Sequence, residues 1–304
     1  MKRFVFAFAA SAIMTSSAMA QTIGVSMAQF DDRFLTNLRE AMEAAAEEFG
    51  VNIHFEDAQA DIGRQLNQIQ NFIAQGVDAM IISLVDTAST PGMTKLAVEA
   101  GIPLVYVNRK PFEETLPEGV YYVGSDENVS GRLQGEEIAR LLNNQGKVAI
   151  MMGQLGDATT LLRTEGVEKA AAEHPEIEIV EKQPAKFQRN EAINLMNNWL
   201  VSGVEVDAIA ANNDEMAIGA IMALQQAGKD PKPYIIAGVD ATADALMEMK
   251  RGNLDITVFQ DAKGQGRGAV ETAVEVIKGE KVETFVWIPF ELVTQDNYEK
   301  YLSR

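Results

Sequence analysis

Cysteine is absent from the 304 residues, and histidine occurs only twice, at His54 and His174. Without cysteine the chain forms no disulfide, no iron–sulfur cluster, no thiolate nucleophile and no cysteine-rich zinc site. Two histidines far apart in the chain also speak against a histidine-rich metal centre and against a Ser–His catalytic relay. We therefore expect a protein without a bound metal or cofactor.

Positive charge is scarce as well, since 26 Lys and Arg residues stand against 44 Asp and Glu residues, for a formal net charge of −18. Nucleic acids bind proteins through clustered cations. The composition therefore excludes a nucleic-acid partner, and it equally disfavours an anionic membrane surface. A hydrophobic content of 47% still allows a substantial core over a length that suits two ordinary domains.

An apolar stretch lies at the N-terminus, from Phe4 to Ile13, and it is too short to span a bilayer. It follows Lys2 and Arg3 and runs through small residues to an A-x-A pattern at residues 18–20. This layout is typical of a cleaved secretory signal peptide. We expect residues 1–20 to be removed on export; a buried first helix or a membrane anchor is the alternative.

The rest of the chain alternates short apolar runs with amphipathic segments. The runs are continuously apolar, as in parallel strands whose two faces are covered by helices. They lie near 23–27, 51–55, 79–82, 103–107, 121–123, 147–152, 177–181, 207–211, 235–239 and 255–259. Between them apolar residues recur at three- and four-residue steps, the period of a helical face. About ten such strands favour two doubly wound α/β domains over one, with a closed eight-stranded barrel as the alternative.

Polar and aromatic side chains follow the ends of most of these runs. Ligands of open α/β sheets bind beyond the carboxyl ends of the strands, so these side chains are candidates for a binding site. They are Phe30, Asp32, Phe34, Ser83, Asn108, Arg109, Asn213, Asp240 and Gln260. Helix capping is an alternative role for Asn and Asp, and we assign Asn128, Asp157 and Asp244 to capping or solvation. Capping does not account for Arg109, for Gln260 or for two aromatic rings in one loop.

This set of side chains suits a polyol. Each hydroxyl of such a ligand both donates and accepts, while a carboxylate accepts, a guanidinium donates to two neighbouring oxygens and an amide does both. Aromatic faces, here Phe30, Phe34 and Phe187, cover the C–H faces of a ring. Since no strong pair of nucleophile and base stands among these residues, binding without chemical conversion is the simpler interpretation.

Four motifs carry a family resemblance when they follow one another in this order behind a signal peptide. They are IGVSMAQFDDRF at 23–34, YYVGSD at 121–126, NDEMAIGA at 213–220 and GVDAT at 238–242. Over essentially the whole mature sequence the chain resembles the periplasmic sugar-binding proteins of the ribose/galactose type. Three further segments look closest to the subgroup that binds myo-inositol and rhizopine: VNR at 107–109, VDAT at 239–242 and FQD at 259–261.

The resemblance implies the type I periplasmic binding fold, in which two doubly wound parallel-sheet domains are joined by a three-segment hinge. The N-terminal lobe would comprise residues 21–125 plus 261–289, and the C-terminal lobe residues 126–260 plus 290–304. The implied function is that of a monomeric substrate-binding component of an ABC importer in the periplasm. Such a protein closes on its ligand by hinge motion and delivers it to the membrane permease; a chemoreceptor is a further candidate partner.

The resemblance also extends the binding site. Arg163 matches the family's second arginine, and Phe187 matches an aromatic wall. Ser83 stands where ribose and galactose binders usually have Asn, Leu35 where ribose binders have a second Phe, and Asn108 where they have Asp. These departures speak against ribose and favour a cyclitol such as myo-inositol or a related inositol. The calcium loop of the galactose binders has no counterpart, so no metal is expected.

Three alternatives stay open. The ligand could be an aldose of the ribose or galactose type. The chain could be a sugar-oxidising or sugar-hydrolysing enzyme, since GQGRGA at 264–269 loosely fits the dinucleotide fingerprint and Asp31 with Asp32 could serve as acid and base. Close helix packing is the simpler explanation of those glycines. A sugar-responsive repressor would need a basic helix-turn-helix where the signal peptide stands.

Overall fold

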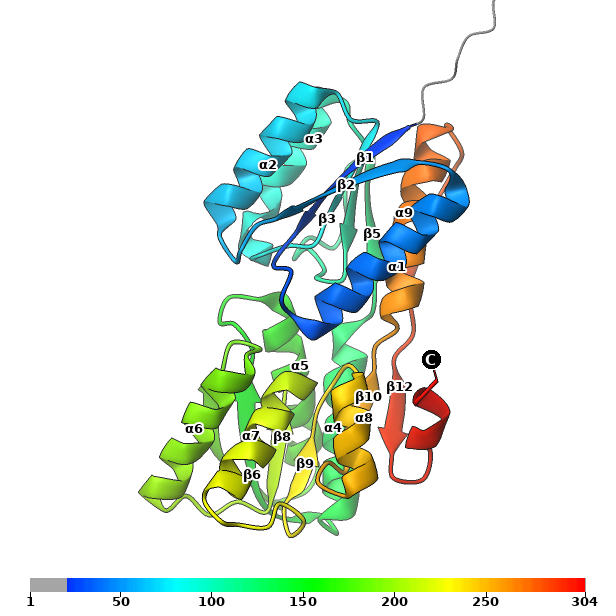
Figure 1. Ribbon diagram of the computed structural model, residues 1–304. Helices are drawn as coiled ribbons and strands as arrows, with labels where there is room; N and C mark the ends of the chain where they lie inside the picture. The colour runs from blue at the N-terminus through cyan, green and yellow to red at the C-terminus, as the bar shows by residue number, and fades with distance from the viewer. Residues whose placement is uncertain (1–20, 304) are drawn as a thin grey trace, which may run out of the picture.

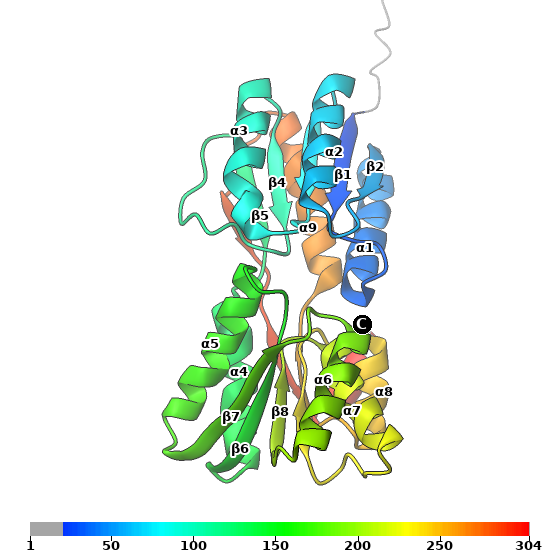
Figure 2. The same cartoon turned by 90° about the vertical axis from the view of Figure 1, so that its left-hand side faces the viewer.

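The structure, a computed structural model, describes residues 21–303, so the predicted signal peptide at residues 1–20 lies outside the described residues. Two α/β lobes stand end to end, each built around a six-stranded sheet (Figure 1). In the view from the side, helices cover both faces of the sheets (Figure 2). Within the described range no helix is both long enough and apolar enough to cross a membrane.

The upper lobe in Figure 1 carries the N-terminal segment. Its elements are β1 (Thr22–Met27), α1 (Arg33–Phe49), β2 (Asn52–Asp57), α2 (Ile62–Gln75), β3 (Ala79–Ile82), η1 (Thr87–Ser89), α3 (Thr90–Ala100), β4 (Leu104–Val107), β5 (Val120–Gly124), α9 (Ala262–Ile277) and β11 (Phe285–Trp287). The strands are parallel in the order β11-β5-β4-β3-β1-β2. One apolar core joins the sheet to α1 and α9, and a second joins its other face to α2 and α3.

The lower lobe repeats this arrangement. Its elements are α4 (Glu127–Leu141), β6 (Gln145–Met152), α5 (Ala158–Ala172), β7 (Glu176–Pro184), α6 (Arg189–Ser202), β8 (Ala208–Ala211), α7 (Asp214–Gln226), β9 (Ile235–Ala237), α8 (Ala243–Arg251), β10 (Ile256–Phe259), β12 (Glu291–Thr294) and η2 (Tyr298–Tyr301). The strand order is β12-β10-β9-β8-β6-β7, with β12 antiparallel to β10. Helices α6, α7 and α8 pack on one face, and α4 and α5 on the other.

The two open sheets confirm the predicted doubly wound α/β fold and exclude the closed eight-stranded barrel. The continuously apolar runs are indeed central strands, since every residue of β3, β4 and β8 is buried. The sequence reading missed β11 and β12. These are short edge strands whose residues are mostly half-exposed, so they lack the continuous apolar signal that marks the central strands.

The chain passes between the two sheets three times, after β5, after β10 and after β11. The hydroxyl of Tyr122 donates to the carbonyl of Ser125 at 3.1 Å, and Gln265 Nε2 donates to Ser125 Oγ at 2.9 Å. Ser125 belongs to the first passage and Gln265 lies just beyond the second. The buried hydrogen bond from Gln265 to Ser125 therefore connects the first passage to the start of α9, just beyond the second.

The glycine-rich segment 264–269 lies in the N-terminal half of α9. A Cβ on Gly266 would lie 2.8 Å from the carbonyl oxygen of Leu38 and 2.8 Å from the Cβ of Ala41, both on α1. Only glycine allows two helices to approach so closely. The packing of α9 on α1 thus explains Gly266, in agreement with the close helix packing expected for the glycines of this motif.

Candidate functional site

A cavity of about 40 Å³ lies between the two lobes, where segments that follow strands of both sheets meet. Carboxylates, arginines, amides and aromatic rings line it: Asp32, Phe34, Leu35, Asn108, Arg109, Thr159, Arg163, Phe187, Asn213, Asp240 and Gln260. Nine of the eleven predicted binding residues are among them, although they are spread over most of the sequence. Leu35 and Thr159 were not among the predicted binding residues, although Leu35 stands where ribose binders have a second Phe. Thr159 lies in the first turn of α5.

Phe30 and Ser83 are the two predicted residues that do not line the cavity. The guanidinium of Arg39 covers the Phe30 ring at 4.3 Å from its centroid, so this ring packs against α1. Ser83 is fully buried behind the end of β3, where its carbonyl oxygen accepts a hydrogen bond from Gln65 Nε2 at 2.9 Å. Both residues follow a strand, but their side chains are turned to neighbouring helices or into the core.

Asp32 and Asn213 each combine a cap with a place in the cavity wall. Asp32 Oδ1 accepts from the backbone N–H of Leu35 at 2.8 Å and caps α1. Asn213 Oδ1 accepts from the N–H of Met216 at 3.0 Å and caps α7. Capping fixes both side chains. The second carboxylate oxygen of Asp32 can face a ligand, whereas Asn213 Nδ2 also donates to the carbonyl of Phe187 at 3.3 Å and keeps one further N–H. Burial raises the pKa of the Asp32 carboxyl, a shift that the Leu35 hydrogen bond opposes.

Arg109 connects the two lobes. Its Nη1 donates to the carbonyls of Leu84 at 2.8 Å and Val85 at 2.9 Å in its own lobe. Its Nε lies 3.2 Å from Asp157 Oδ2 in the other lobe. Asp157 also caps α5 by accepting from the N–H of Thr159 at 2.9 Å, which confirms the capping role expected for it. The ion pair across the cleft is a second role that its sequence context did not reveal.

Arg163 is buried in a network of acceptors. Its Nε donates to Glu127 Oε2 at 2.7 Å, and its Nη1 donates to the carbonyl of Asn212 at 2.6 Å. Its Nη2 donates to Gln260 Oε1 at 3.2 Å, and Nη1 lies 3.7 Å from Asp240 Oδ1. Glu127 escaped sequence reasoning, because a carboxylate in the first turn of a helix is an ordinary partner of the helix dipole.

Unusual backbone conformations gather at the cavity. Asn108 has φ +70°, Phe187 φ +62° and Asp240 φ +122°, and Ala241 follows with φ +52°. Residues other than glycine rarely adopt positive φ, and such residues cluster at functional sites where the surroundings hold them. Burial raises the pKa of the Asp240 carboxyl well above its ordinary value, while the Arg163 guanidinium opposes this shift.

Two polar atoms of the cavity wall are left without a hydrogen-bond partner among residues 21–303: Thr159 Oγ1 and Gln260 Nε2. Buried polar atoms are normally paired, so both can serve a hydroxylated ligand. Within the same range no group of three or more His, Asp or Glu side chains is arranged to hold a metal ion. The donors, acceptors and two aromatic rings of the wall suit the recognition of a hydroxylated ring.

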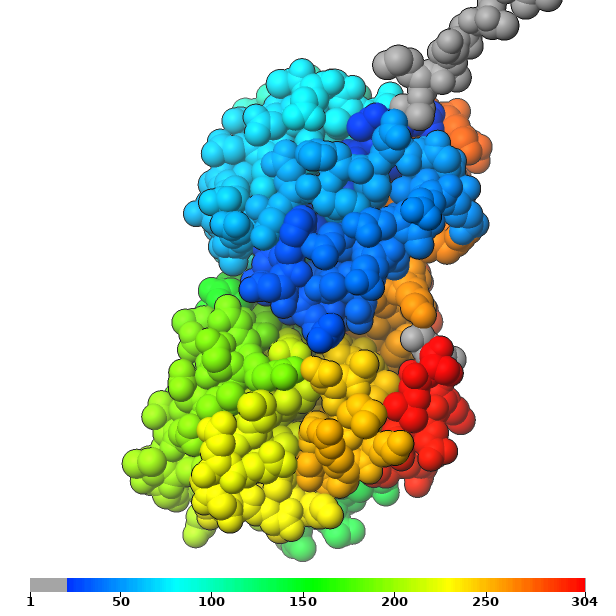
Figure 3. Space-filling view, in the orientation of Figure 1, coloured from blue at the N-terminus to red at the C-terminus, as the bar shows by residue number. Residues whose placement is uncertain are grey.

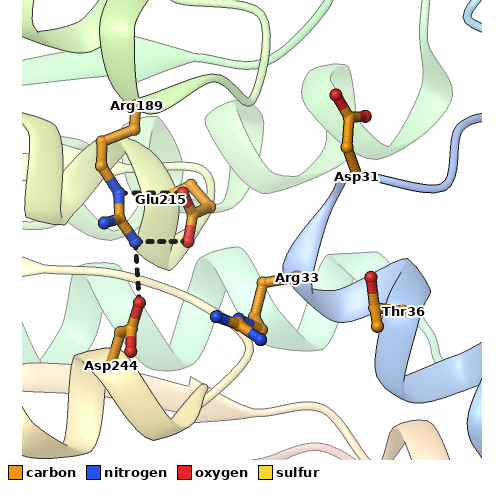
Figure 4. A pocket seen from close by; sticks show the side chains of 6 residues that line it. All are labelled: Asp31, Arg33, Thr36, Arg189, Glu215 and Asp244. Atoms are coloured by element: carbon orange, nitrogen blue, oxygen red, sulfur yellow. Dashed lines mark hydrogen bonds and ion pairs between the residues drawn. The ribbon is translucent and has the colours of Figure 1, made fainter.

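A second, wider pocket of about 420 Å³ lies beside this cavity, lined by Asp31, Arg33 and Thr36 from the upper lobe and Arg189, Glu215 and Asp244 from the lower lobe (Figure 4). Arg189 donates to Glu215 at 2.9 and 2.8 Å and to Asp244 at 3.0 Å. Several of these residues are sequence neighbours of the cavity wall. In the space-filling view the blue start of α1 reaches down to the lower lobe (Figure 3).

Comparison with known proteins agrees with this architecture. A model of the periplasmic binding protein domain matches residues 23–281. A Rhizobium meliloti protein named "Putative rhizopine-binding protein" is 50% identical over 308 residues, covering 100% of both chains. The ribose import binding protein of Escherichia coli (strain K12) is 32% identical and covers 96% of this chain and 97% of its own length.

Solved structures show the same fold. An ABC transporter solute binding protein from Bacillus halodurans C-125 with bound myo-inositol is 46% identical, with a TM-score of 0.88 over 95% of this chain and 99% of that one. The Caulobacter myo-inositol binding protein bound to myo-inositol is 27% identical, with a TM-score of 0.88 over 94% and 98%. These matches confirm the resemblance that the sequence motifs carry. The chain belongs to the periplasmic binding protein family.

Proposed function

We propose that this protein is the periplasmic substrate-binding component of an ABC importer and that it binds a cyclitol, with myo-inositol or a related inositol as the best candidate. The observation that carries this proposal is the buried cavity wall, in which Thr159 Oγ1 and Gln260 Nε2 have no hydrogen-bond partner within the described chain. The relative named for rhizopine and the two solved structures with myo-inositol support the cyclitol class.

The roles of the side chains follow from their chemistry. Asp32 and Asp240 accept hydrogen bonds from ligand hydroxyls, and the guanidinium groups donate to ligand oxygens. Amides do both, and aromatic rings cover the C–H faces of the ring. The proposed ligand-binding residues are Asp32, Phe34, Asn108, Arg109, Thr159, Arg163, Phe187, Asn213, Asp240 and Gln260. The ligand is released unchanged, as expected for a transport protein.

Capture of the ligand requires the two lobes to move apart. The cavity lies between side chains of both lobes, and Arg109 and Asp157 join the lobes beside it. We assign the moving bodies to residues 21–125 plus 261–289 and to residues 126–260 plus 290–304, with the three passages as the hinge. Ligand binding shifts the equilibrium between open and closed forms by the energy of the contacts that closure adds.

The partner that recognises the closed form is the membrane permease of the importer. A signal peptide at residues 1–20 accounts for export to the periplasm. The protein acts as a monomer in this scheme, because one chain supplies both walls of the cavity. A chemoreceptor is a second candidate partner for the same closed form.

A thermal-shift panel of myo-inositol, scyllo-inositol, ribose, galactose and xylose tests the proposal. Myo-inositol or scyllo-inositol should raise the unfolding temperature, and calorimetry should give a dissociation constant of about micromolar order. Stabilisation by ribose or galactose with no effect of either inositol would replace the cyclitol by an aldose. Chemical analysis of the recovered ligand separates binding from catalysis, since an enzyme would return an altered molecule.

A further inference from the structure

Asp214 is a fully buried carboxylate that the binding site does not use directly. It is the first residue of α7, next to the cavity residue Asn213, and it does not line the cavity. Its Oδ1 accepts from Thr257 Oγ1 at 2.7 Å. Its Oδ2 accepts from the backbone N–H of Thr242 at 2.8 Å and from Thr242 Oγ1 at 3.2 Å. Three donors therefore converge on one side chain in the interior.

These donors belong to the bend that carries Asp240. Thr257 Oγ1, which donates to Asp214, also accepts from the N–H of Ala241 at 3.1 Å. Thr242 follows Ala241 directly and caps α8. The bend itself consists of Asp240 and Ala241, both with positive φ. A non-glycine backbone keeps such a conformation only where its surroundings hold it. The Asp214 carboxylate holds this bend through its hydrogen bonds with Thr242 and Thr257.

The backbone also makes room for this carboxylate. A Cβ on Gly238 would lie 2.2 Å from Asp214 Oδ1, so a larger residue there would displace the carboxylate. The N–H of Asp214 donates to the carbonyl of Val239 at 2.8 Å. Asp214 is thus bonded to the segment immediately before Asp240 as well as to the residues after it.

We propose that Asp214 is a positioning residue for ligand binding, which holds the bend at Asp240 and Ala241 so that the Asp240 carboxylate faces the cavity beside Arg163. The inference rests on the proposed function insofar as Asp240 binds the ligand. Asp214 acts through Asp240 and does not itself touch the ligand. The contribution of Asp214 to ligand affinity should therefore disappear when the Asp240 carboxylate is removed by substitution.

A double-mutant cycle tests this dependence. Asp214→Asn keeps the shape of the side chain but replaces one acceptor oxygen by an NH₂ group that faces donors. Calorimetry with myo-inositol should show affinity weakened by about tenfold or more in Asp214→Asn, and no further loss when this change is added to Asp240→Asn. Wild-type affinity in Asp214→Asn, or an undiminished loss in the Asp240→Asn background, would overturn the proposal.

Thr257 provides a second variant in case Asp214→Asn does not fold. Thr257→Val removes the hydroxyl that links Asp214 to Ala241 and should weaken myo-inositol binding in the same way. Thr257→Ser keeps the hydroxyl and should restore the affinity to within about twofold of the wild type. A loss in Thr257→Ser as large as that in Thr257→Val would show that the hydroxyl does not hold the bend, and would overturn the proposal. Asp255→Asn is the matched control, since Asp255 accepts from the N–H of Ile236 at 2.9 Å, beside a strand start of the same sheet.

A readout without ligand keeps this proposal separate from the proposed function. The N–H of Ala241 is held by Thr257 Oγ1, so its hydrogen exchange, followed by NMR on the ligand-free protein, should be about tenfold faster or more in Asp214→Asn. Amides of β4 in the other lobe serve as the internal reference. If the wild type bound no cyclitol, the proposed function would fail. Hydrogen exchange at Ala241 would still test the role of Asp214. Unchanged exchange at Ala241 would overturn that role.

Discussion

Arg109 of the upper lobe and Asp157 of the lower lobe face each other across the cleft, with Nε 3.2 Å from Oδ2. Each is fixed within its own lobe, Arg109 by the carbonyls of Leu84 and Val85 and Asp157 by its cap on α5. The pair therefore forms only when the lobes are close together. Because Arg109 also lines the cavity, it would couple closure of the cleft to the site proposed to bind the ligand.

Asp157→Asn should weaken ligand binding without unfolding α5. The amide oxygen can still cap the helix, but the charge that attracts Arg109 across the cleft is gone. We expect a loss of about 1.5 kcal/mol, or roughly tenfold in affinity, caused mainly by faster release. Titration calorimetry and stopped-flow release measure the two quantities. Asp61→Asn, a change in the cap of α2, is the control and should bind as the wild type does.

Asp240→Ala should remove a hydrogen-bonding carboxyl group from the cavity. Asp240 lies on the bend with positive φ, and its Oδ1 is 3.7 Å from Arg163 Nη1. The expected loss is about 1.5–3 kcal/mol of binding free energy, or roughly ten- to 150-fold in affinity. Calorimetry with the ligand identified by the thermal-shift panel measures it. An affinity equal to that of the wild type would remove Asp240 from the site.

The sequence predicts the fold and most of the cavity wall, because continuous apolar runs mark the central strands and polar residues follow their ends. It cannot predict which of those residues turn into the cavity. Phe30 and Ser83 obey the same rule as Asp32 and Asn108, yet Phe30 packs under Arg39 and Ser83 is buried behind β3. Side-chain direction depends on the packing of neighbouring helices, which the position along the chain does not record.

The buried network escaped prediction for a related reason. Glu127 and Asp214 look like ordinary acidic residues of a first helical turn. Only the fold brings Glu127 against Arg163, which is 36 positions away, and Asp214 against Thr257, which is 43 positions away. Long-range pairing of this kind leaves no local pattern, so a sequence without its fold gives no reason to prefer a buried partner over solvent.

Glu127→Ala should destabilise the lower lobe more than most substitutions. Glu127 pairs with Arg163 at 2.7 Å, and both side chains are almost fully buried. Removing Glu127 takes away the closest carboxylate of the buried Arg163 and leaves Asp240 Oδ1, at 3.7 Å, as a weaker partner, at a cost of up to about 3–5 kcal/mol of unfolding free energy. Urea denaturation measures this loss. The double variant Glu127→Leu with Arg163→Met removes both charges and should recover much of the stability while ligand affinity remains low.

Stability should also depend on pH through Asp214. Burial raises the pKa of this carboxyl from 3.8 to about 7, although the hydrogen bonds from Thr257 and Thr242 oppose the shift. A folded-state pKa above the unfolded value means that this contribution to stability is complete below about pH 4 and is lost as the pH rises through about 7. The urea midpoint of the wild type should therefore fall between about pH 4 and pH 7.

Asp214→Asn tests that effect, because the amide does not titrate. The charge of Asp214 also raises the pKa of the Asp240 carboxyl, so the variant reduces the slope that Asp240 contributes in the same direction. We expect the fall of the urea midpoint with pH to be clearly smaller in Asp214→Asn than in the wild type, with Asp61→Asn keeping the wild-type slope. Identical slopes in all three proteins would show that Asp214 stays ionised across this range, and that its three hydrogen bonds outweigh its burial.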